Sequence, residues 1–320
     1  MRLGIVTPFY FPSVRGNSIT VQRIESGVRD QGVIVRVWSL ENGISPGEIL
    51  QALEEFTPDL VHGFHASSSG QVVTDAAFRL GIPSILTVTG TDVNTDLFDP
   101  RRRTGVMNIL RLATRIVVFH DVMRVKLVAE LPEVEHRIRV IGQTVHCQET
   151  PFDLRQHLGL QPDDLIFCIP AGIRRIKDVT FCLKPLDALR IQYPQVKAVF
   201  VGPIIEAAEG ARLQELLRDY QWAFYLGPVP HEQVCAILTS VDVVINSSLS
   251  EGGMANSILE AMSCGRAVLA RDIEGNRSVV QDEIDGLLFG SEAEFAHKAE
   301  RLIREPSLCH ALGKSGKEKI

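Results

Sequence analysis

The sequence predicts an α/β protein made of two doubly wound parallel sheets. Short β-branched runs alternate with longer amphipathic stretches along the whole chain, which is typical of strand–helix–strand units. The alternation stops once, in the polar stretch 143–152, and then starts again. A length of 320 residues, with 45% apolar and 22% charged residues, suits two globular domains. We therefore expect domains at 1–147 and 148–320.

Six strands and five helices are predicted in the first domain. The glycine at 32 and the Gly-Ile-Pro stretch at 81–83 mark where helices end. The expected strands are 3–7, 33–38, 60–63, 84–88, 115–119 and 137–141. The expected helices are 19–31, 46–56, 71–80, 104–112 and 121–129.

The second domain repeats the pattern with six more strands and helices between them. The expected strands are 165–171, 198–201, 223–226, 241–246, 267–270 and 286–289. Helices 293–304 and 307–319 are predicted to end the chain.

Charge and composition exclude several classes of protein. A net charge of −6 and a pI near 5.9 provide no basic field, so we expect no nucleic-acid partner. No apolar run approaches the ~18 residues that span a bilayer. The apolar N-terminus is interrupted by Pro8 and is expected to be a buried strand, not a signal peptide. The scattered cysteines lack metal-binding spacing, so we expect unpaired thiols in a reduced, cytoplasmic protein. They are Cys147, Cys168, Cys182, Cys235, Cys264 and Cys309.

Ligands of parallel sheets bind beyond the carboxyl ends of the strands, so the loops there are the candidate sites. The first loop, 8–18, ends in Gly16 and Asn17 and precedes a helix. A glycine there lets the backbone approach an anion, although neither a GxGxxG fingerprint nor a P-loop is present. An ordinary turn, with Asn17 or Ser18 capping the helix, is the alternative.

The second loop carries Gly172, Arg174 and Lys177 directly after strand 165–171. An arginine fork and a lysine point charge suit a diphosphate, whereas a solvated basic loop is the alternative. No close acidic pair follows an apolar strand, so we expect no divalent-metal site. Arg174 and Lys177 then supply the positive charge that a metal would bring.

The third loop carries Glu251, with Gly252 and Gly253 behind it, and leads into a helix expected to begin near Ala255. The backbone amides of the glycines are available to a ligand. Glu260 on this helix is flanked by apolar residues and is expected to be partly buried. A carboxylate there accepts both hydroxyls of a ribose, whereas a solvent-facing glutamate is the alternative.

Two further loops follow neighbouring strands of the first domain. One carries His62 and His65, and the other carries Thr89, Gly90 and Asp92. Because both lie at strand carboxyl ends, they are expected to converge. A histidine in such a place is often a structural residue, and that alternative stays open for both.

The second half resembles the donor-binding domain of retaining nucleotide-sugar glycosyltransferases of group 1 (family 4). These enzymes have the GT-B fold, in which two Rossmann-like domains face each other across a cleft. The resemblance is carried in order by Gly172, Arg174, Lys177, 201–202, 226–227, 242–248, 250–262, 265–270 and 285–288. The Gly-Thr-Asp-Val-Asn segment 90–94 is similar to the glycosyltransferase-1-domain-containing proteins. The first half resembles the family more weakly, through 16–17, 59–62 and 82–87.

The resemblance implies a role for each matched residue. Arg174 and Lys177 hold the diphosphate, Glu260 holds the ribose, and Glu251 with the amides of residues 252–254 holds the sugar. The implied catalytic residues are Arg174, Lys177, Glu251 and His65. The implied donor-binding residues are Gly16, Asn17, Gly172, Gly202, Gly252, Gly253, Met254, Ala255, Asn256 and Glu260. The implied sugar or acceptor contacts are Thr89, Gly90 and Asp92.

Three positions depart from the family pattern. Eight residues separate Glu251 from Glu260 where seven are usual, so either a bulge or Gly252 keeps the register. Arg174 and Lys177 are closer together than in most members. Thr89 stands where a histidine is often found, and His65 is the substitute that we expect.

The resulting expectation is sugar transfer from a nucleoside-diphosphate sugar, with retention at the anomeric carbon and with no metal or other cofactor. The base, the sugar, the acceptor and the oligomeric state are not determined by the sequence. A nucleotide-sugar epimerase and a degenerate nucleotide-sugar-binding protein are the alternatives. Peripheral membrane association also stays open, with the basic run 101–103 as the candidate patch.

Overall fold

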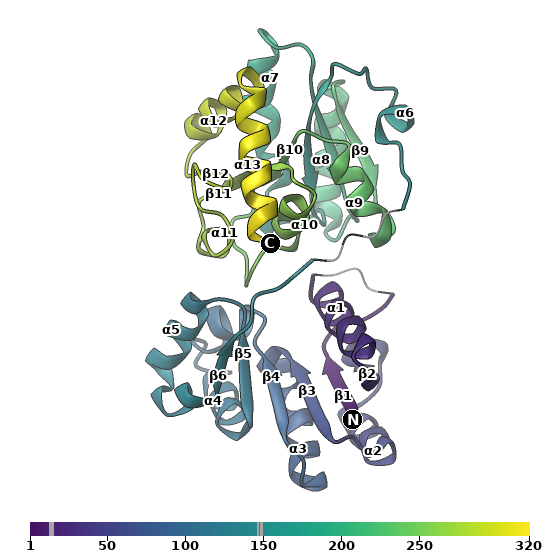
Figure 1. Cartoon of the computed structure of the whole chain (residues 1–320), viewed down its shortest axis with the longest axis vertical. Coiled ribbons are helices and arrows are strands. Elements are labelled where there is room, and N and C mark those ends of the chain that lie inside the picture. Colours follow the sequence, from purple (N-terminus) through teal and green to yellow (C-terminus); the bar gives the residue numbers. More distant parts are fainter. Residues whose placement is uncertain (13–15, 146, 148–149) are drawn as a thin grey trace. The chain divides into compact units, whose positions relative to one another are not determined.

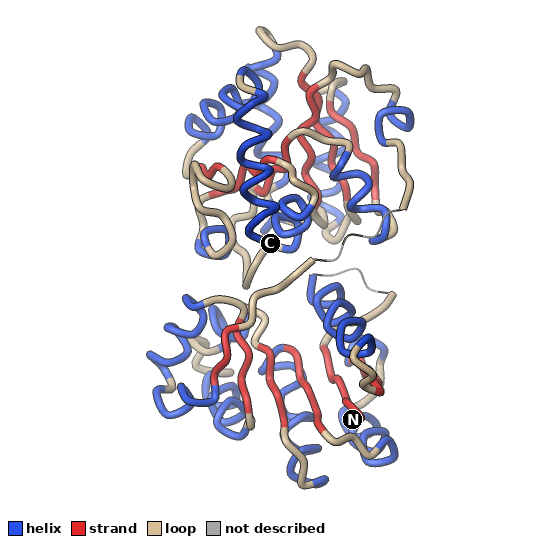
Figure 2. The backbone as a smooth tube through the Cα atoms, viewed as in Figure 1, coloured by secondary structure: helices blue, strands red, loops and turns tan. Residues whose placement is uncertain are grey.

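The computed structural model describes residues 1–12, 16–145, 147 and 150–320. These residues form two compact units, Met1–Gln143 and Thr144–Ile320 (Figure 1). Each unit contains a six-stranded parallel sheet with helices on its faces (Figure 2). All the strands predicted from the sequence are present, each within two residues of its expected ends. The doubly wound α/β prediction is confirmed for both units.

The sheet of unit 1 has the order β2-β1-β3-β4-β5-β6, and the order reverses between β1 and β3. Its strands are β1 (Arg2–Thr7), β2 (Ile34–Ser39), β3 (Leu60–Phe64), β4 (Ser84–Thr87), β5 (Arg115–Val118) and β6 (Ile138–Val140). Its α-helices are α1 (Gly16–Asp30), α2 (Pro46–Phe56), α3 (Gly70–Leu80), α4 (Arg103–Leu112) and α5 (Asp121–Glu130).

Local sequence explains where α2 starts. The Ser45 side chain accepts a hydrogen bond from the Glu48 amide, and the Glu48 carboxylate accepts one from the Ser45 amide. Pro46 occupies the first helical position, where no amide hydrogen is needed. The sequence did not predict the two π-helical turns, His65–Ser69 and Asp92–Asp96, which follow β3 and β4.

The sheet of unit 2 has the order β12-β11-β10-β7-β8-β9, and its order reverses between β7 and β10. Its strands are β7 (Leu165–Pro170), β8 (Val196–Val201), β9 (Ala223–Gly227), β10 (Val243–Asn246), β11 (Ala267–Arg271) and β12 (Leu287–Phe289). Its α-helices are α6 (Leu154–Leu158), α7 (Leu183–Arg190), α8 (Ala207–Asp219), α9 (His231–Thr239), α10 (Asn256–Ser263), α11 (Glu274–Arg277), α12 (Glu292–Arg304) and α13 (Pro306–Lys319).

Strand β7 shows how the core of unit 2 is built. Phe167 and Ile169 lie in the apolar cluster beneath α7 and α12, whereas Ile166 and Cys168 lie in the cluster beneath α9 and α10. Successive residues of a strand point to opposite faces, so covering both faces requires a nearly continuous apolar run. This requirement is why the strands were readable from the sequence.

The expectation of unpaired cysteines is wrong for one pair. Cys147 and Cys235 form a disulfide, with their Cα atoms 5.6 Å apart although 88 residues separate them in the chain. Sequence spacing carries no signal for this contact, because folding alone brings the start of unit 2 against α9. Among the described residues, Cys168, Cys182, Cys264 and Cys309 are free thiols.

No helix in the described ranges has both the length and the apolar character needed to cross a membrane.

Candidate functional site

An ion pair lies at the carboxyl ends of β7 and β10, where the strand order of unit 2 reverses. Lys177 comes from the loop after β7, and Glu251 from the loop after β10. The Lys177 Nζ is 2.5 Å from the Glu251 Oε1, and their side chains are 16% and 11% exposed. Such a reversal leaves room for a ligand, because the two loops diverge to opposite faces of the sheet.

The two carboxylate oxygens of Glu251 are used differently. Oε1 also accepts hydrogen bonds from the Ser248 Oγ at 2.7 Å and the Asn246 Nδ2 at 3.2 Å. Among the described residues, Oε2 accepts no hydrogen bond. One oxygen is thus held in place by the protein, and the other is left with its acceptor capacity unused.

The charge of Glu251 depends on Lys177. Burial by itself raises the pKa of the Glu251 carboxyl, but the nearby ammonium and the three hydrogen bonds outweigh it and lower the pKa overall. Glu251 is therefore a carboxylate at neutral pH, although it is largely removed from water.

Asn246 and Asn276 orient the polar groups that hydrogen-bond to Glu251. The Asn246 Oδ1 accepts from the Ser248 amide at 3.1 Å and from the Asn276 Nδ2 at 3.3 Å, which turns the Asn246 amino group toward Glu251. Asn276 is fully buried. A Cβ on Gly275 would lie 2.5 Å from the Glu251 Cβ, so the backbone of α11 approaches this loop too closely for any side chain.

The backbone at Lys177 is held by the loop that follows β10. The Ser247 Oγ donates to the carbonyls of Lys177 and Asp178, at 3.1 and 2.9 Å. Asp178 has a φ of 43° and accepts a 2.7 Å hydrogen bond from Arg271, whose guanidinium lies over the Phe181 ring. The two loops of the site are thus fastened to each other before any ligand binds.

Arg174 and the glycines of the β7 loop are placed differently from Lys177. The Arg174 side chain is exposed and makes no hydrogen bond or ion pair within the described residues, whereas its backbone carbonyl accepts from the Lys177 amide at 2.9 Å. A Cβ on Gly202, which has a φ of 139°, would lie 2.3 Å from the Ala171 carbonyl oxygen, so this glycine lets the β7 and β8 loops pass closely. A Cβ on Gly172 would lie 3.0 Å from the Ile205 side chain.

Helix α10 begins at Asn256, with Ala255 as its N-cap and Gly252, Gly253 and Met254 leading into it, which confirms the expected start. Glu260 on this helix is only 6% exposed, so its predicted burial is also confirmed. Its Oε1 lies 3.7 Å from the Nε2 of His231, the first residue of α9. A solvent-facing role for Glu260 is excluded.

In unit 1, α1 begins next to the end of β1, at the reversal of that sheet. The Asn17 Nδ2 donates to the Thr7 Oγ1 at 3.2 Å, which fixes the start of the helix. The Asn17 Oδ1 and the Ser18 Oγ are buried and have no partner among the described residues. Neither side chain therefore caps α1, as the alternative of an ordinary turn would require. Residues 13–15 of this predicted loop lie outside the described residues.

Of the two predicted histidines, His62 lies within β3 and His65 directly follows it, and the two differ in role. His62 is buried, stacks on Phe64 and shares a 2.7 Å hydrogen bond with Thr87, and its burial lowers its pKa to about 4. His62 therefore has a structural role, which was the alternative to a catalytic one. His65 has a φ of 70°, and its Nδ1 lies within 3.2 Å of the Ser67 and Ser68 hydroxyls.

The structure gives Asp92 a different role from the expected sugar or acceptor contact. Its side chain is fully buried, and its carboxylate accepts hydrogen bonds from the amides of Ala66, Thr89 and Gly90. The carboxylate thereby ties the loops after β3 and β4 together. Thr89 and Gly90 contribute backbone amides to this arrangement.

The sequence of unit 2 matches the family model of glycosyl transferases group 1 over residues 152–319, more than half of the chain. This chain belongs to that family. Residues 9–144 match a second model, the glycosyl transferase 4-like domain.

Relatives of this chain carry the names of glycosyltransferases. Glycosyltransferase 1 domain-containing protein 1 of Xenopus tropicalis is 26% identical over 317 residues, covering 95% of this chain and 89% of its own length. D-inositol 3-phosphate glycosyltransferase of Streptomyces bingchenggensis is 26% identical over 280 residues, covering 80% of this chain and 61% of its own length.

Solved structures show the same fold. Anabaena HepE, crystallised in complex with UDP, superposes with a TM-score of 0.79 at 17% identity, covering 99% of this chain and 94% of its own. Sucrose-phosphate synthase from Thermosynechococcus elongatus superposes with a TM-score of 0.77 at 18% identity, covering 99% and 93%. This group 1 glycosyltransferase therefore has the two-domain GT-B fold.

Proposed function

We propose that the protein transfers a sugar from a UDP-sugar to an acceptor, with retention of anomeric configuration and without a divalent metal. The Lys177–Glu251 pair carries the proposal, because it sets a cation and an unused carboxylate oxygen at the strand-order reversal of unit 2. UDP is the first nucleotide to test, since HepE was crystallised with UDP and with UDP-glucose.

Lys177 and Arg174 act on the leaving group. Breaking the bond between the anomeric carbon and the diphosphate oxygen develops negative charge on the diphosphate, and cations placed there in advance lower the barrier. The backbone of Lys177 is held by Ser247. The Arg174 side chain is exposed and has no hydrogen-bond or ion-pair partner among the described residues. Arg174 thus needs to break no ion pair to reach a phosphate.

Glu251 and Glu260 recognise the two sugars of the donor. The Glu251 Oε2 accepts a hydroxyl of the transferred sugar, while Lys177 and its other partners keep the carboxylate ionised. Glu260 accepts the ribose hydroxyls from helix α10. The amino end of that helix, at Asn256, adds a favourable dipole for the phosphates.

The retaining route that we propose forms no covalent bond to Glu251. The Glu251 Oε1 accepts three hydrogen bonds, one of them within the ion pair to Lys177, and the proposal assigns Oε2 to a sugar hydroxyl and not to attack on the anomeric carbon. We therefore propose departure and attack on the same face, with the leaving diphosphate oxygen taking the proton of the acceptor. This route needs no protein base.

Donor binding is tested first by thermal unfolding with UDP, UDP-glucose and other nucleotide sugars. A donor at 100 times its Kd raises the free energy of unfolding by about 2.7 kcal/mol. Acceptors are then screened with phosphorylated polyols included, because a D-inositol 3-phosphate glycosyltransferase is among the relatives.

The anomeric configuration of the product, read by NMR, tests retention, and turnover in EDTA tests metal independence. A product of inverted configuration contradicts the retaining route, and loss of turnover in EDTA contradicts the metal-free one. Donor epimerisation without any acceptor would assign an epimerase instead. Tight donor binding with neither transfer nor hydrolysis would assign a degenerate binding protein.

A further inference from the structure

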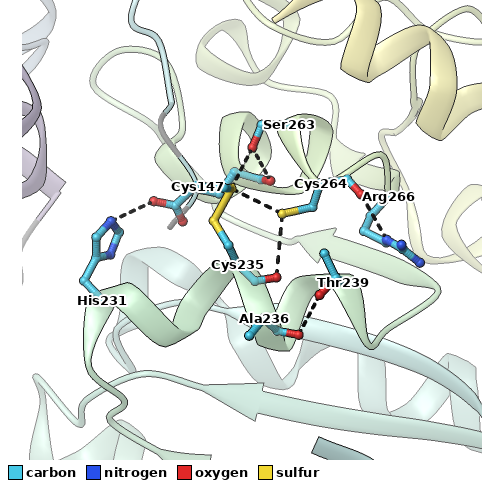
Figure 3. Close-up of a disulfide and its surroundings, with 9 residues drawn as sticks. Cys147, His231, Cys235, Ala236, Thr239, Ser263, Cys264 and Arg266 are labelled. Carbon is cyan, nitrogen blue, oxygen red and sulfur yellow. Dashed lines mark hydrogen bonds and ion pairs between the residues drawn. A yellow bond between two sulfur atoms is a disulfide. The ribbon is translucent and has the colours of Figure 1, made fainter. Parts of the chain in front are cut away.

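Three cysteines of unit 2 meet at one point, outside the ion pair at the strand ends. The Sγ atoms of Cys147, Cys235 and Cys264 all lie within 4.8 Å of one another (Figure 3). Cys147 and Cys235 are joined as a disulfide, and Cys264 is a free thiol. The Cys264 Sγ is 3.5 Å from the Cys147 Sγ, so a third sulfur directly adjoins an existing disulfide.

The three sulfurs come from three separate segments. Cys147 lies near the start of unit 2, Cys235 lies on α9, and Cys264 directly follows the last residue of α10. All three belong to the apolar cluster that covers one face of the sheet. Cys147 is therefore bonded to one helix while its sulfur touches the end of the next.

Ser263 adds a second link between Cys147 and α10. Its hydroxyl is 3.2 Å from the Cys147 Sγ and donates a 2.9 Å hydrogen bond to the Glu260 carbonyl (Figure 3). The sulfur of Cys147 is thus already positioned against α10 while it is bonded to α9.

We propose that these cysteines form a thiol–disulfide exchange site, in which the sulfur of Cys147 bonds to either Cys235 or Cys264. In the exchange, the Cys264 thiolate attacks the Cys147 Sγ, and a new bond forms between these two sulfurs. The bond to Cys235 breaks, and Cys235 leaves as a thiolate and takes up the proton that Cys264 gave up. The step is an isomerisation, so it consumes no oxidant or reductant.

Burial of the Cys264 thiol slows this exchange, and the Ser263 hydrogen bond and neighbouring charges modify the effect. Burial raises the pKa of the Cys264 thiol, and the Glu260 carboxylate raises it further, whereas Arg266 and Lys317 lower it. The exchange is therefore slow at neutral pH and faster in alkaline solution, where more thiolate is present.

The exchange also bears on the donor site, a step that rests on the proposed function. Cys264 lies four residues beyond Glu260, and His231 of α9 pairs with Glu260. Moving the tether from α9 to the end of α10 must bring two sulfurs from 3.5 Å to bonding distance. The shift acts on the helix that carries the proposed ribose carboxylate.

The first experiment uses the full chain with Cys235→Ser in a buffer of reduced and oxidised glutathione. Oxidised glutathione takes two electrons from the Cys147 and Cys264 thiols and becomes two molecules of the reduced form. After acid quenching and alkylation, peptide mapping is expected to show a Cys147–Cys264 disulfide. Wild-type protein kept at alkaline pH without glutathione is expected to contain both disulfides.

Two results would overturn the exchange site. One is full alkylation of Cys147 and Cys264 in the Cys235→Ser variant, together with a single disulfide in the wild type at every pH. The other is a reduced protein that holds one zinc ion on all three cysteines and protects them from alkylation, which would make the cluster a metal site. Cys309→Ser is the matched control and is expected to leave both disulfides unchanged.

The second experiment compares UDP binding by calorimetry in two locked forms, oxidised Cys235→Ser and oxidised Cys264→Ser. We expect the form tethered to α10 to bind UDP about fivefold more weakly or worse, the lower end of usual couplings between sites. Equal affinities would overturn the coupling and leave the exchange intact. If neither form nor the wild type binds UDP, the proposed donor fails, while the peptide map still decides the exchange.

Discussion

Both units place a buried carboxylate beside the carboxyl ends of their strands, yet the two carboxylates are used in opposite ways. In unit 1, Asp92 is fully buried, and both of its oxygens accept backbone amides. In unit 2, Glu251 keeps three side-chain donors on Oε1, and Oε2 has no partner among the described residues. A carboxylate with all its acceptor capacity satisfied holds loops together, whereas one with an unused oxygen is available to a ligand.

The largest effect is expected from Asp92→Ala. Removing this carboxylate leaves several buried amides of unit 1 without acceptors, and hydrogen bonds to charged groups are worth about 1.5–3 kcal/mol each. We expect the free energy of unfolding to fall by about 3 kcal/mol or more in denaturant titrations. UDP binding by unit 2 is expected to survive.

Asp30→Asn, at the exposed end of α1, is the control and is expected to leave stability unchanged. If Asp92→Ala were as stable as the wild type and lost only acceptor turnover, Asp92 would be a ligand contact after all.

Lys177→Ala tests the proposed donor site of unit 2. It removes the cation that faces the leaving diphosphate, and the loss of one such electrostatic stabiliser lowers kcat about 10²-fold or more. Arg174→Ala is expected to act in the same direction. Steady-state kinetics with the donor identified by thermal unfolding provide the measurement.

The neighbouring Arg175→Ala is the matched control, because the Arg175 side chain is exposed and makes no hydrogen bond or ion pair among the described residues. An unchanged kcat in both Lys177→Ala and Arg174→Ala would contradict the proposal that these two cations stabilise the leaving diphosphate.

Asn276→Ala tests whether Asn276 acts on Glu251 through Asn246. Asn276 touches Glu251 only through Asn246, so the variant loosens the orientation of the Asn246 amide and leaves the charges of the site in place. We expect a loss of about 2 kcal/mol in stability, because the Asn276 Nδ2 donates both to the Asn246 Oδ1 and to the Arg271 carbonyl, and each such bond is worth about 1 kcal/mol. We also expect a raised KM for the donor with a nearly unchanged kcat. A KM equal to that of the wild type would show that Asn276 has a structural role alone.

The smallest effect concerns pH, because the stability contributed by Glu251 changes only in acidic solution and is constant near neutrality. The pKa of Glu251 is lowered in the folded protein, so its contribution to stability is present above the unfolded value and is lost as the pH falls through the folded pKa. In Lys177→Met, the ammonium no longer lowers this pKa, so the variant has less of this stabilisation. The difference in unfolding free energy between wild type and variant is therefore largest near neutrality and should shrink as acid protonates Glu251 in both proteins.

Denaturant titrations of both proteins across this pH range measure that difference. A difference that stays constant, or that grows on acidification, would contradict the ionised state assigned to Glu251.

Much of the candidate site was predictable from its position in the chain. The apolar run 165–170 identified β7, and this placed Lys177 at a strand end, as the run before Asn246 did for Glu251. The supporting residues were not predictable in the same way. Asn276 lies on a different element from the residues it orients, and nothing in its own sequence neighbourhood marks it as buried.

The sequence by itself determined the strands, the two doubly wound sheets and the family, because strands buried on both faces need continuous apolar runs and loops at strand ends carry the polar motifs. Only the tertiary structure decided which carboxylate is consumed by backbone amides, which oxygen of Glu251 stays unused, and that Cys147 meets Cys235 and Cys264. The physical reason is that hydrogen bonding, burial and disulfide formation depend on distances between atoms. Residues 88 apart in the chain have no defined distance until the sheets have formed around them.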